Sequence, residues 1–203
     1  SPNGDWPYPH ADTRPPVCLN YITQTVIGMR VLQLYAPKPA KTAADKAIRQ
    51  AAAWLAKAQS SNNEDRSWRL KGLAWAGLDK AAIQTAMKEL LAVQRADGGW
   101  ADLPSMKETS AFATGESLVA LHEAGLPVSD PAYQRGVKYL LESQQEDGSW
   151  YVKTRALAFQ PGFDAGFPHG TDQFMSAAGT SWASMALALT LPESGPATAS
   201  RLP

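Results

Sequence analysis

The side chains best suited to chemistry in this sequence are concentrated in one segment, residues 151–172 (YVKTRALAFQPGFDAGFPHGTD). Guanidinium, amide, imidazole and carboxylate groups lie there beside phenylalanines, and together such groups can bind a polar ligand or a partner. A second interpretation is proton transfer between His169 and an aspartate. The candidate ligand- or partner-binding residues of this segment are Arg155, Gln160, Phe163, His169 and Asp172.

The same segment is long for a connection between helices, with about twenty residues where about 2–8 are usual. Long ordered loops over a cavity are often binding elements. A stretch of similar character, WPYPHADTRPP at residues 6–16, also combines aromatic, proline, histidine and aspartate residues. A structural interpretation stays open, in which both stretches close one end of a helical core, phenylalanines fill it, and Arg155 pairs with Asp164 or Asp172.

Metal-binding and nucleophilic motifs are sparse. Cys18 is the single cysteine, which excludes an internal disulfide and a zinc site built from two cysteines. Zinc held by His10, Asp12 and Cys18 is conceivable, but a buried free cysteine is the simpler interpretation, so we predict no metal and no cofactor. No Gly-x-Ser-x-Gly nucleophile motif is present. The carboxylates are dispersed: no two aspartates lie within four residues of each other, and Glu108 and Glu116 are eight residues apart.

A repeated seven-residue pattern indicates how these residues are positioned. QRADGGW at 94–100 returns as QQEDGSW at 144–150. Asp-Gly is a turn signal, because both residue types tolerate positive φ. NGDW at 3–6 matches the end of the pattern, and EDRSW at 64–68 matches it without the glycine. We therefore predict four turns that end in tryptophan, at Trp6, Trp68, Trp100 and Trp150.

Two kinds of helix are predicted to alternate around these turns. Amphipathic segments precede three of them: 42–59, 79–94 and 130–144. Their predicted N-terminal caps are Thr42 in a capping box with Asp45, then Asp79, and then Asp130 followed by Pro131. Segments that are apolar on most sides, and so buried on most sides, follow the turns: 21–36, 69–78, 110–125 and 173–189. The expected fold is all-α, with repeated hairpins of inner and outer helices.

Residues 1–191 are predicted to form one such repeat domain, and residues 192–203 a flexible C-terminal tail. Four inner helices against three outer ones suggest a fragment of a longer protein. The turns should hold repeats together, each glutamine amide bonding the start of a neighbouring outer helix while the indole covers it. The residues of this structural motif are Gln94, Asp97, Gly98, Trp100, Gln144, Asp147, Gly148 and Trp150.

The pattern resembles the QW motif of squalene–hopene cyclases and of the wider prenyltransferase and squalene oxidase repeat family. The resemblance covers nearly the whole chain, and residues 150–189 are similar to the ending of bacterial repeat proteins of this group that have no assigned activity. It implies an α/α-toroid, of which this chain supplies part of the ring. Trp75 and Trp182, on inner helices, could then line a cavity, although core packing is the simpler interpretation.

The catalytic signatures of the related enzymes do not carry over. Cyclases use an Asp-x-Asp-Asp-Thr acid, whereas the corresponding region here reads ETSAFATGES at 108–117. Prenyltransferases on this scaffold bind zinc through Asp, Cys and His, and no Asp-x-Cys pair is present. The Gly-Cys-Gly-Glu-Gln segment of thioester domains is absent as well.

Three functions stay open. The one we favour is a non-catalytic squalene-cyclase-like repeat domain that binds a partner protein, or another part of a longer chain, through an incomplete ring. One alternative is a terpenoid cyclase or prenyltransferase-type enzyme with an isoprenoid-like apolar ligand. Another is a carbohydrate-binding or lyase-like toroid.

Charge and hydropathy exclude other partners. Nineteen basic residues balance nineteen acidic ones, so no net field attracts nucleic acid or an anionic membrane. The longest apolar run, residues 182–191, is too short to cross a bilayer. No targeting signal is recognised, and the sequence leaves the compartment open.

Overall fold

The computed structural model describes residues 1–6, 20–77, 79–155 and 163–192 of the chain. Within these ranges the chain forms seven α-helices and, apart from an isolated bridge between Trp100 and Ser110, no paired strand. This confirms the all-α prediction. The helices are α1 (Tyr21–Tyr35), α2 (Lys41–Lys57), α3 (Asn63–Ala76), α4 (Lys80–Leu91), α5 (Ala111–Glu123), α6 (Pro131–Ser143) and α7 (Gln173–Ala188).

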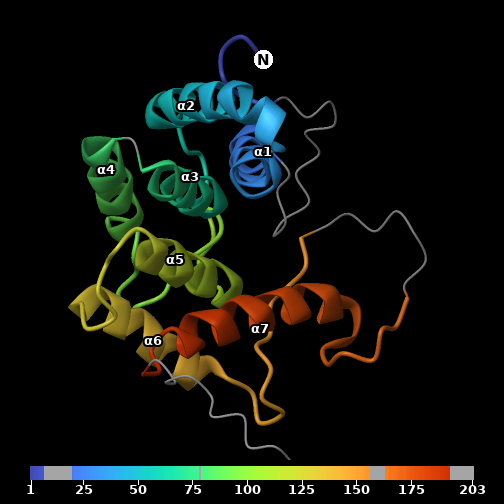
Figure 1. Ribbon diagram of the computed structural model, residues 1–203. Helices are drawn as coiled ribbons and strands as arrows, with labels where there is room; N and C mark the ends of the chain where they lie inside the picture. Colours follow the sequence, from blue (N-terminus) through green and yellow to red (C-terminus); the bar gives the residue numbers. More distant parts are fainter. Residues whose placement is uncertain (7–19, 78, 156–162, 193–203) are drawn as a thin grey trace, which may run out of the picture.

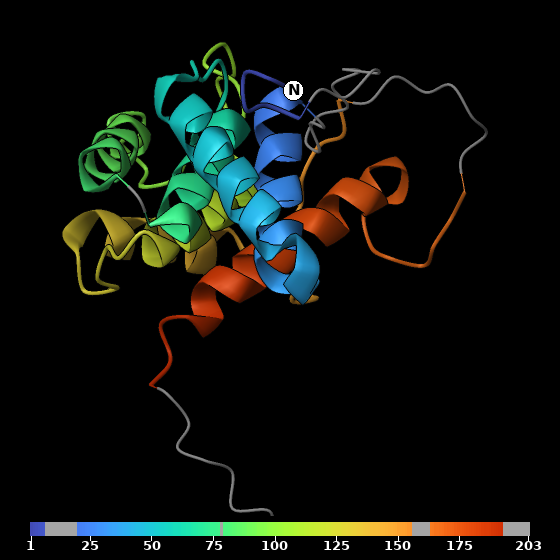
Figure 2. The same cartoon turned by 45° about the horizontal axis from the view of Figure 1, so that its top comes forward.

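The helices lie in two layers that curve together (Figure 1). Helices α1, α3, α5 and α7 follow one another along the inner side of the curve, and each contacts the next. Helices α2, α4 and α6 lie on the outer side, where α2 contacts α1 and α3, α4 contacts α3, and α6 contacts α5. Figure 2 shows α2 crossing over its two inner neighbours. The predicted alternation of inner and outer helices is therefore present.

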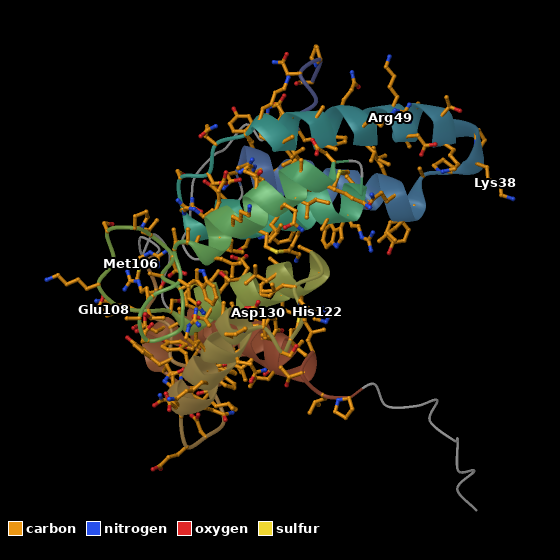
Figure 3. The ribbon with its side chains drawn as sticks, turned by 90° about the vertical axis from the view of Figure 1, so that its left-hand side faces the viewer. Lys38, Arg49, Met106, Glu108, His122 and Asp130 are labelled. Carbon is orange, nitrogen blue, oxygen red and sulfur yellow. The ribbon has the colours of Figure 1, made fainter. Side chains whose placement is uncertain are left out.

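Hydrophobic patterning accounts for the two layers. On the inner helix α5, every residue from Ala111 to Leu121 is buried, because neighbours cover it on all sides. On the outer helix α6, the buried residues recur at helical spacing, from Tyr133 through Gly136 and Val137 to Leu140. Arg49, on the outer side of α2, points away from the protein (Figure 3).

The predicted caps are right for two outer helices and wrong for the third. Asp79 accepts a hydrogen bond from the Ala82 backbone N–H, and Asp130 accepts one from Ala132. Helix α2 instead follows a short 3₁₀ turn, Lys38–Ala40, and its N-cap Ala40 has no side chain that could accept a bond. The capping box at Thr42 is therefore wrong.

The predicted turn at Trp68 is also wrong. Helix α3 begins at Asn63, and its N-cap Asn62 accepts a hydrogen bond from the Asp65 backbone N–H. Since this capping residue lies upstream and the pattern has no glycine here, the chain continues as helix through Trp68. The inner helix consequently starts six residues before the predicted start at 69.

Small residues bring two inner helices into close contact. A Cβ atom on Gly115 of α5 would lie 2.5 Å from the backbone carbon of Trp182 on α7. A Cβ on Gly179 of α7 would lie 2.4 Å from Val152 Cγ2. Gly115 therefore lets the α5 and α7 backbones approach closely, whereas Gly179 leaves room for the Val152 side chain against α7.

Candidate functional site

Turns 94–100 and 144–150 have nearly the same internal geometry. In turn 94–100, the Trp100 indole N–H donates to Leu90 O over 2.8 Å, and the Trp100 backbone N–H donates to the Thr114 hydroxyl over 2.9 Å. In turn 144–150, Trp150 makes the same bonds to Leu140 O over 2.8 Å and to the Thr180 hydroxyl over 3.0 Å. Each turn thus ties an outer helix to the following inner helix.

The two glutamines differ in their partners. Gln94 Nε2 donates to Gly98 O over 2.8 Å and to Ala132 O, in the first turn of α6, over 2.7 Å. Its Oε1 accepts a bond from Arg135 over 2.6 Å. Gln144 Nε2 donates to Gly148 O over 2.9 Å, and the described residues give it no second partner.

Trp75 and Trp182 come together on the inner layer, around a residue that the sequence analysis did not single out. The Lys71 ammonium lies 4.4 Å from the Trp68 ring, 5.0 Å from Trp75 and 4.9 Å from Trp182. We call these three indoles the tryptophan cage. Burial lowers the pKa of Lys71, while Glu123 and Glu116 act in the opposite direction. The cage stabilises the buried cation through the electron-rich ring faces.

A buried carboxyl group lies next to this cage. Glu116, on α5, is 1% exposed. Burial raises its pKa well above the usual value, and the neighbouring Glu64 and Asp102 raise it further, while Lys71 and Trp68 oppose the shift. These effects favour a neutral carboxylic acid at Glu116. Such a group can donate a hydrogen bond, but it is a weaker acid than a free glutamate.

The described candidate residues of segment 151–172 make different contacts. Arg155 forms an ion pair with the buried Asp102, so the predicted pairing with Asp164 or Asp172 is wrong. The structure brings Asp102 to this segment from 53 residues away, a partner that local spacing could not reveal. Phe163 is 72% exposed and does not fill the core.

His169 and Asp172 of this segment lie near Tyr151. Its hydroxyl donates to Asp172 over 2.9 Å, and its ring contacts His169 edge to face at 5.4 Å. His169 Nε2 is 2.7 Å from the Ser149 hydroxyl. Gln160 lies outside the described residues, as do His10, Asp12 and Cys18 of the conceivable zinc site.

A pocket of about 570 Å³ lies elsewhere, where the C-terminal end of α2 meets the first residues of α1 and α3. Its walls include the aromatic side chains of Tyr21 and Trp54 and the polar side chains of Asp5, Lys57 and Gln59. The sequence analysis did not connect these residues, because they come from three separate stretches of the chain.

The sequence does contain a signal for Lys71 and Glu116, two buried ionisable residues that were not predicted as site residues. Lys71 is the one charged residue within LKGLAWAGL, and Glu116 is the one within SAFATGES. A lone charge in a helix that is otherwise apolar predicts either a buried polar contact or a functional group.

Among the described residues, no three metal-ligating side chains lie close enough to hold a metal ion. No described helix is long and apolar enough to span a membrane.

Comparison with known proteins identifies a family. The family model of the squalene-hopene cyclase C-terminal domain matches residues 68–169, half of this chain. A squalene–hopene cyclase from Bradyrhizobium diazoefficiens is 36% identical over 106 residues, which cover 52% of this chain and 12% of that protein. One from Schizosaccharomyces japonicus is 29% identical, with 36% of this chain and 14% of that protein covered.

A third relative, enfumafungin synthase from Hormonema carpetanum, is 36% identical, with 40% of this chain and 7% of that protein covered. This chain therefore spans only 7–14% of the length of the curated relatives it matches. The family match covers the tryptophan cage residues Trp68 and Trp75, Lys71, Glu116 and both complete turns. The chain belongs to the squalene-hopene cyclase C-terminal domain family.

Proposed function

We propose that this squalene cyclase-like domain is a non-catalytic binding module, and that turn 144–150, with the adjoining faces of α6 and α7, receives one helix of a partner protein. The observation that carries the proposal is the difference between the two turns. Turn 94–100 binds the first turn of an outer helix, whereas turn 144–150 has the same geometry and no such helix among the described residues.

Close approach at a glycine supports the proposal. A Cβ on Gly98 would lie 2.4 Å from Arg135 O, so α6 approaches the backbone of turn 94–100 closely. Gly148 has a similar positive φ of 82° against 92° for Gly98, yet the nearest atom to a Cβ there is Gln144 Nε2, 3.9 Å away. Among the described residues, nothing fills at Gly148 the space that α6 fills at Gly98.

Exposed apolar residues lie on α6 and α7, the two helices that turn 144–150 ties together. Leu141, fifty residues after the partly buried Leu91, is 57% exposed. Thr180 on α7 accepts the same backbone bond as Thr114 on α5, so the position five residues later, Met185, corresponds to Val119. Met185 is 45% exposed, whereas Val119 is 5% exposed. Exposed large apolar side chains at positions whose counterparts are buried or partly buried indicate surface that is available for an interaction.

The contacts of α6 define the chemistry of the partner. It should be an amphipathic helix with a carbonyl oxygen in its first turn that can accept an additional bond from Gln144 Nε2, as Ala132 O does from Gln94. A basic residue three positions later would donate to Gln144 Oε1, as Arg135 does to Gln94. Apolar residues at helical spacing would cover Leu141 and Met185.

The inner layer supports the non-catalytic part of the proposal. Protonation of an alkene needs a carboxylic acid of increased acidity, and the pKa of Glu116 is shifted in the opposite direction. The tryptophan cage, which could surround a cationic reaction intermediate, already surrounds the Lys71 ammonium. A chain with this arrangement is better suited to binding than to cyclisation.

A labelled peptide of residues 130–143, the sequence of α6, provides a direct probe. Fluorescence anisotropy should show saturable binding of this peptide to the full chain. Gln144→Ala should weaken binding about fivefold, the equivalent of one hydrogen bond of about 1 kcal/mol. Lys46→Ala, an exposed change on the outer helix α2, is the matched control and should leave binding unchanged.

Two results would contradict the proposal. One is the absence of peptide binding at millimolar concentration. The other is binding that Gln144→Ala and Lys46→Ala affect equally. Turnover of a polyprenyl substrate by the full chain would instead favour the alternative of a terpenoid cyclase or prenyltransferase.

A further inference from the structure

The 570 Å³ pocket is lined by the N-terminal turn, α1, α2 and the start of α3. Helices α1 and α2 lie at the opposite end of the helical array from α6 and α7 (Figure 1). Its floor is the start of α3, where Asp65 is 5% exposed. One Asp65 oxygen accepts hydrogen bonds from the Ser61 backbone N–H and hydroxyl, over 2.8 Å and 2.7 Å. The other accepts one from Asn20 Nδ2 over 2.5 Å. The floor is therefore fixed by internal bonds before any ligand arrives.

The rim of the pocket differs from its floor. Tyr21, 46% exposed, and Lys57 form no side-chain hydrogen bond or ion pair to another described residue. Gln59 Nε2 makes one long bond of 3.5 Å to a backbone oxygen, which leaves its Oε1 without a described partner. Asp5 accepts a bond from the Ser1 hydroxyl at only one of its two oxygens. Donors and acceptors are thus available around a rigid base.

We propose that this pocket binds a neutral saccharide, with Tyr21 and Trp54 packing against the sugar ring and Asp5, Lys57 and Gln59 bonding its hydroxyl groups. Each hydroxyl group of a sugar can both donate and accept a hydrogen bond. It can therefore donate to the Asp5 carboxylate, accept from the Lys57 ammonium, and do either with the Gln59 amide. The C–H faces of the ring present apolar surface to aromatic side chains. The volume lies within the range of about 300–1,000 Å³ typical of small-molecule sites.

Other ligand classes fit the lining less well. An isoprenoid would bury the polar groups of Asp5, Lys57 and Gln59 without partners, at a cost of about 1–3 kcal/mol for each group. A strongly charged ligand of either sign would meet a like charge, since Asp5 and Lys57 both line the pocket. A neutral molecule with many hydroxyls avoids both penalties.

Saturation-transfer-difference NMR on the full chain tests the assignment, with maltose, cellobiose and N,N′-diacetylchitobiose as probes. At least one disaccharide should receive saturation, with the strongest transfer to ring C–H protons that contact the aromatic side chains. Tyr21→Ala should abolish the transfer. Asp5→Ala should weaken binding about tenfold, as expected for the loss of a hydrogen bond to a charged group.

Matched controls on the same helices are Tyr35→Ala, at the far end of α1, and Lys46→Ala on α2; both residues are exposed, and neither change should alter the transfer. The proposal is overturned if none of the three disaccharides receives saturation, or if Tyr21→Ala reduces the transfer no more than Tyr35→Ala does. Displacement of the bound disaccharide by farnesol through the same residues would also contradict it. Helix binding at turn 144–150 is measured separately, so either proposal can fail alone.

Discussion

Turns 94–100 and 144–150 have the same hydrogen bonds within the turn and different surroundings. The indole and backbone N–H groups of Trp100 and Trp150 have equivalent acceptors. Of these two turns, and among the described residues, only turn 94–100 contacts the start of a further helix, through Gln94 and Gly98. The comparison teaches that the seven residues specify the turn, whereas the energetic importance of each side chain depends on what packs against it.

Alanine at the two turn glycines should give the largest difference. Gly98→Ala combines a positive φ with a Cβ 2.4 Å from Arg135 O, and should lower the free energy of unfolding by about 2–5 kcal/mol. Gly148→Ala has only the positive φ and should cost about 1–2 kcal/mol. Urea denaturation of both variants measures the difference, and equal costs would show that the neighbouring helix does not matter.

Valine at the two threonines should give a smaller difference. Thr114→Val leaves the N–H of the buried Trp100 without its acceptor and should cost about 1–3 kcal/mol. Thr180 is partly exposed, so water can replace its hydroxyl, and Thr180→Val should cost about 1 kcal/mol or less. Thermal unfolding of the pair, with serine variants as controls that retain the hydroxyl, provides the test.

Alanine at Gln94 and at Gln144 tests the comparison at equivalent residues with different numbers of hydrogen-bond partners. Gln94→Ala removes bonds to Gly98, Ala132 and Arg135 and should cost about 1–2 kcal/mol. Gln144→Ala removes one bond at an exposed position and should cost about 0.5 kcal/mol or less. A cost at Gln144 equal to that at Gln94 would mean that another segment already occupies turn 144–150.

The smallest effect concerns one of the three positions at which the two copies differ, Gly99 against Ser149, directly after the Asp-Gly pair. The Ser149 hydroxyl and backbone N–H donate to Asp147 and lower its pKa below the ordinary 3.8. Because the folded-state pKa is the lower one, this ionised carboxylate stabilises the native state above the unfolded pKa. The contribution is lost as pH falls through the folded pKa.

Ser149→Gly, which makes the second turn read QQEDGGW, should raise the pKa of Asp147 towards its ordinary value, because the hydroxyl bond that lowers this pKa most is removed. An NMR titration of the carboxyl carbon measures the change. Ser143→Gly, at the C-terminal end of α6 and outside the turn, is the control. An unchanged pKa in Ser149→Gly would assign the shift to the backbone bond alone.

Local features of the fold followed from sequence wherever the responsible residues are close in the chain. Asp79 and Asp130 cap their helices because a side chain one or two residues before a helix reaches its first N–H groups. The same local reasoning failed at Trp68, because Asn62 caps α3 and the helix therefore begins before the predicted turn. It also failed at Thr42, where a 3₁₀ turn precedes the helix.

The candidate sites were much less predictable. Arg155 and Asp102 are 53 residues apart, and the tryptophan cage joins α3 to α7 around Lys71. The pocket combines residues from the N-terminal turn, α1, α2 and the start of α3. Spacing along the chain carries no information about such pairs, because the curvature of the array decides which of them meet.

The sequence by itself determined the order of the inner and outer helices and the tryptophan turns that contain glycine, at Trp6, Trp100 and Trp150, since periodicity and positive-φ glycines act over a few residues. The tertiary structure alone decided which side of the array is open, which charges are buried and paired, and where the pocket lies. Those features depend on contacts between helices, and such contacts arise only when the inner layer curves and the outer layer packs against it.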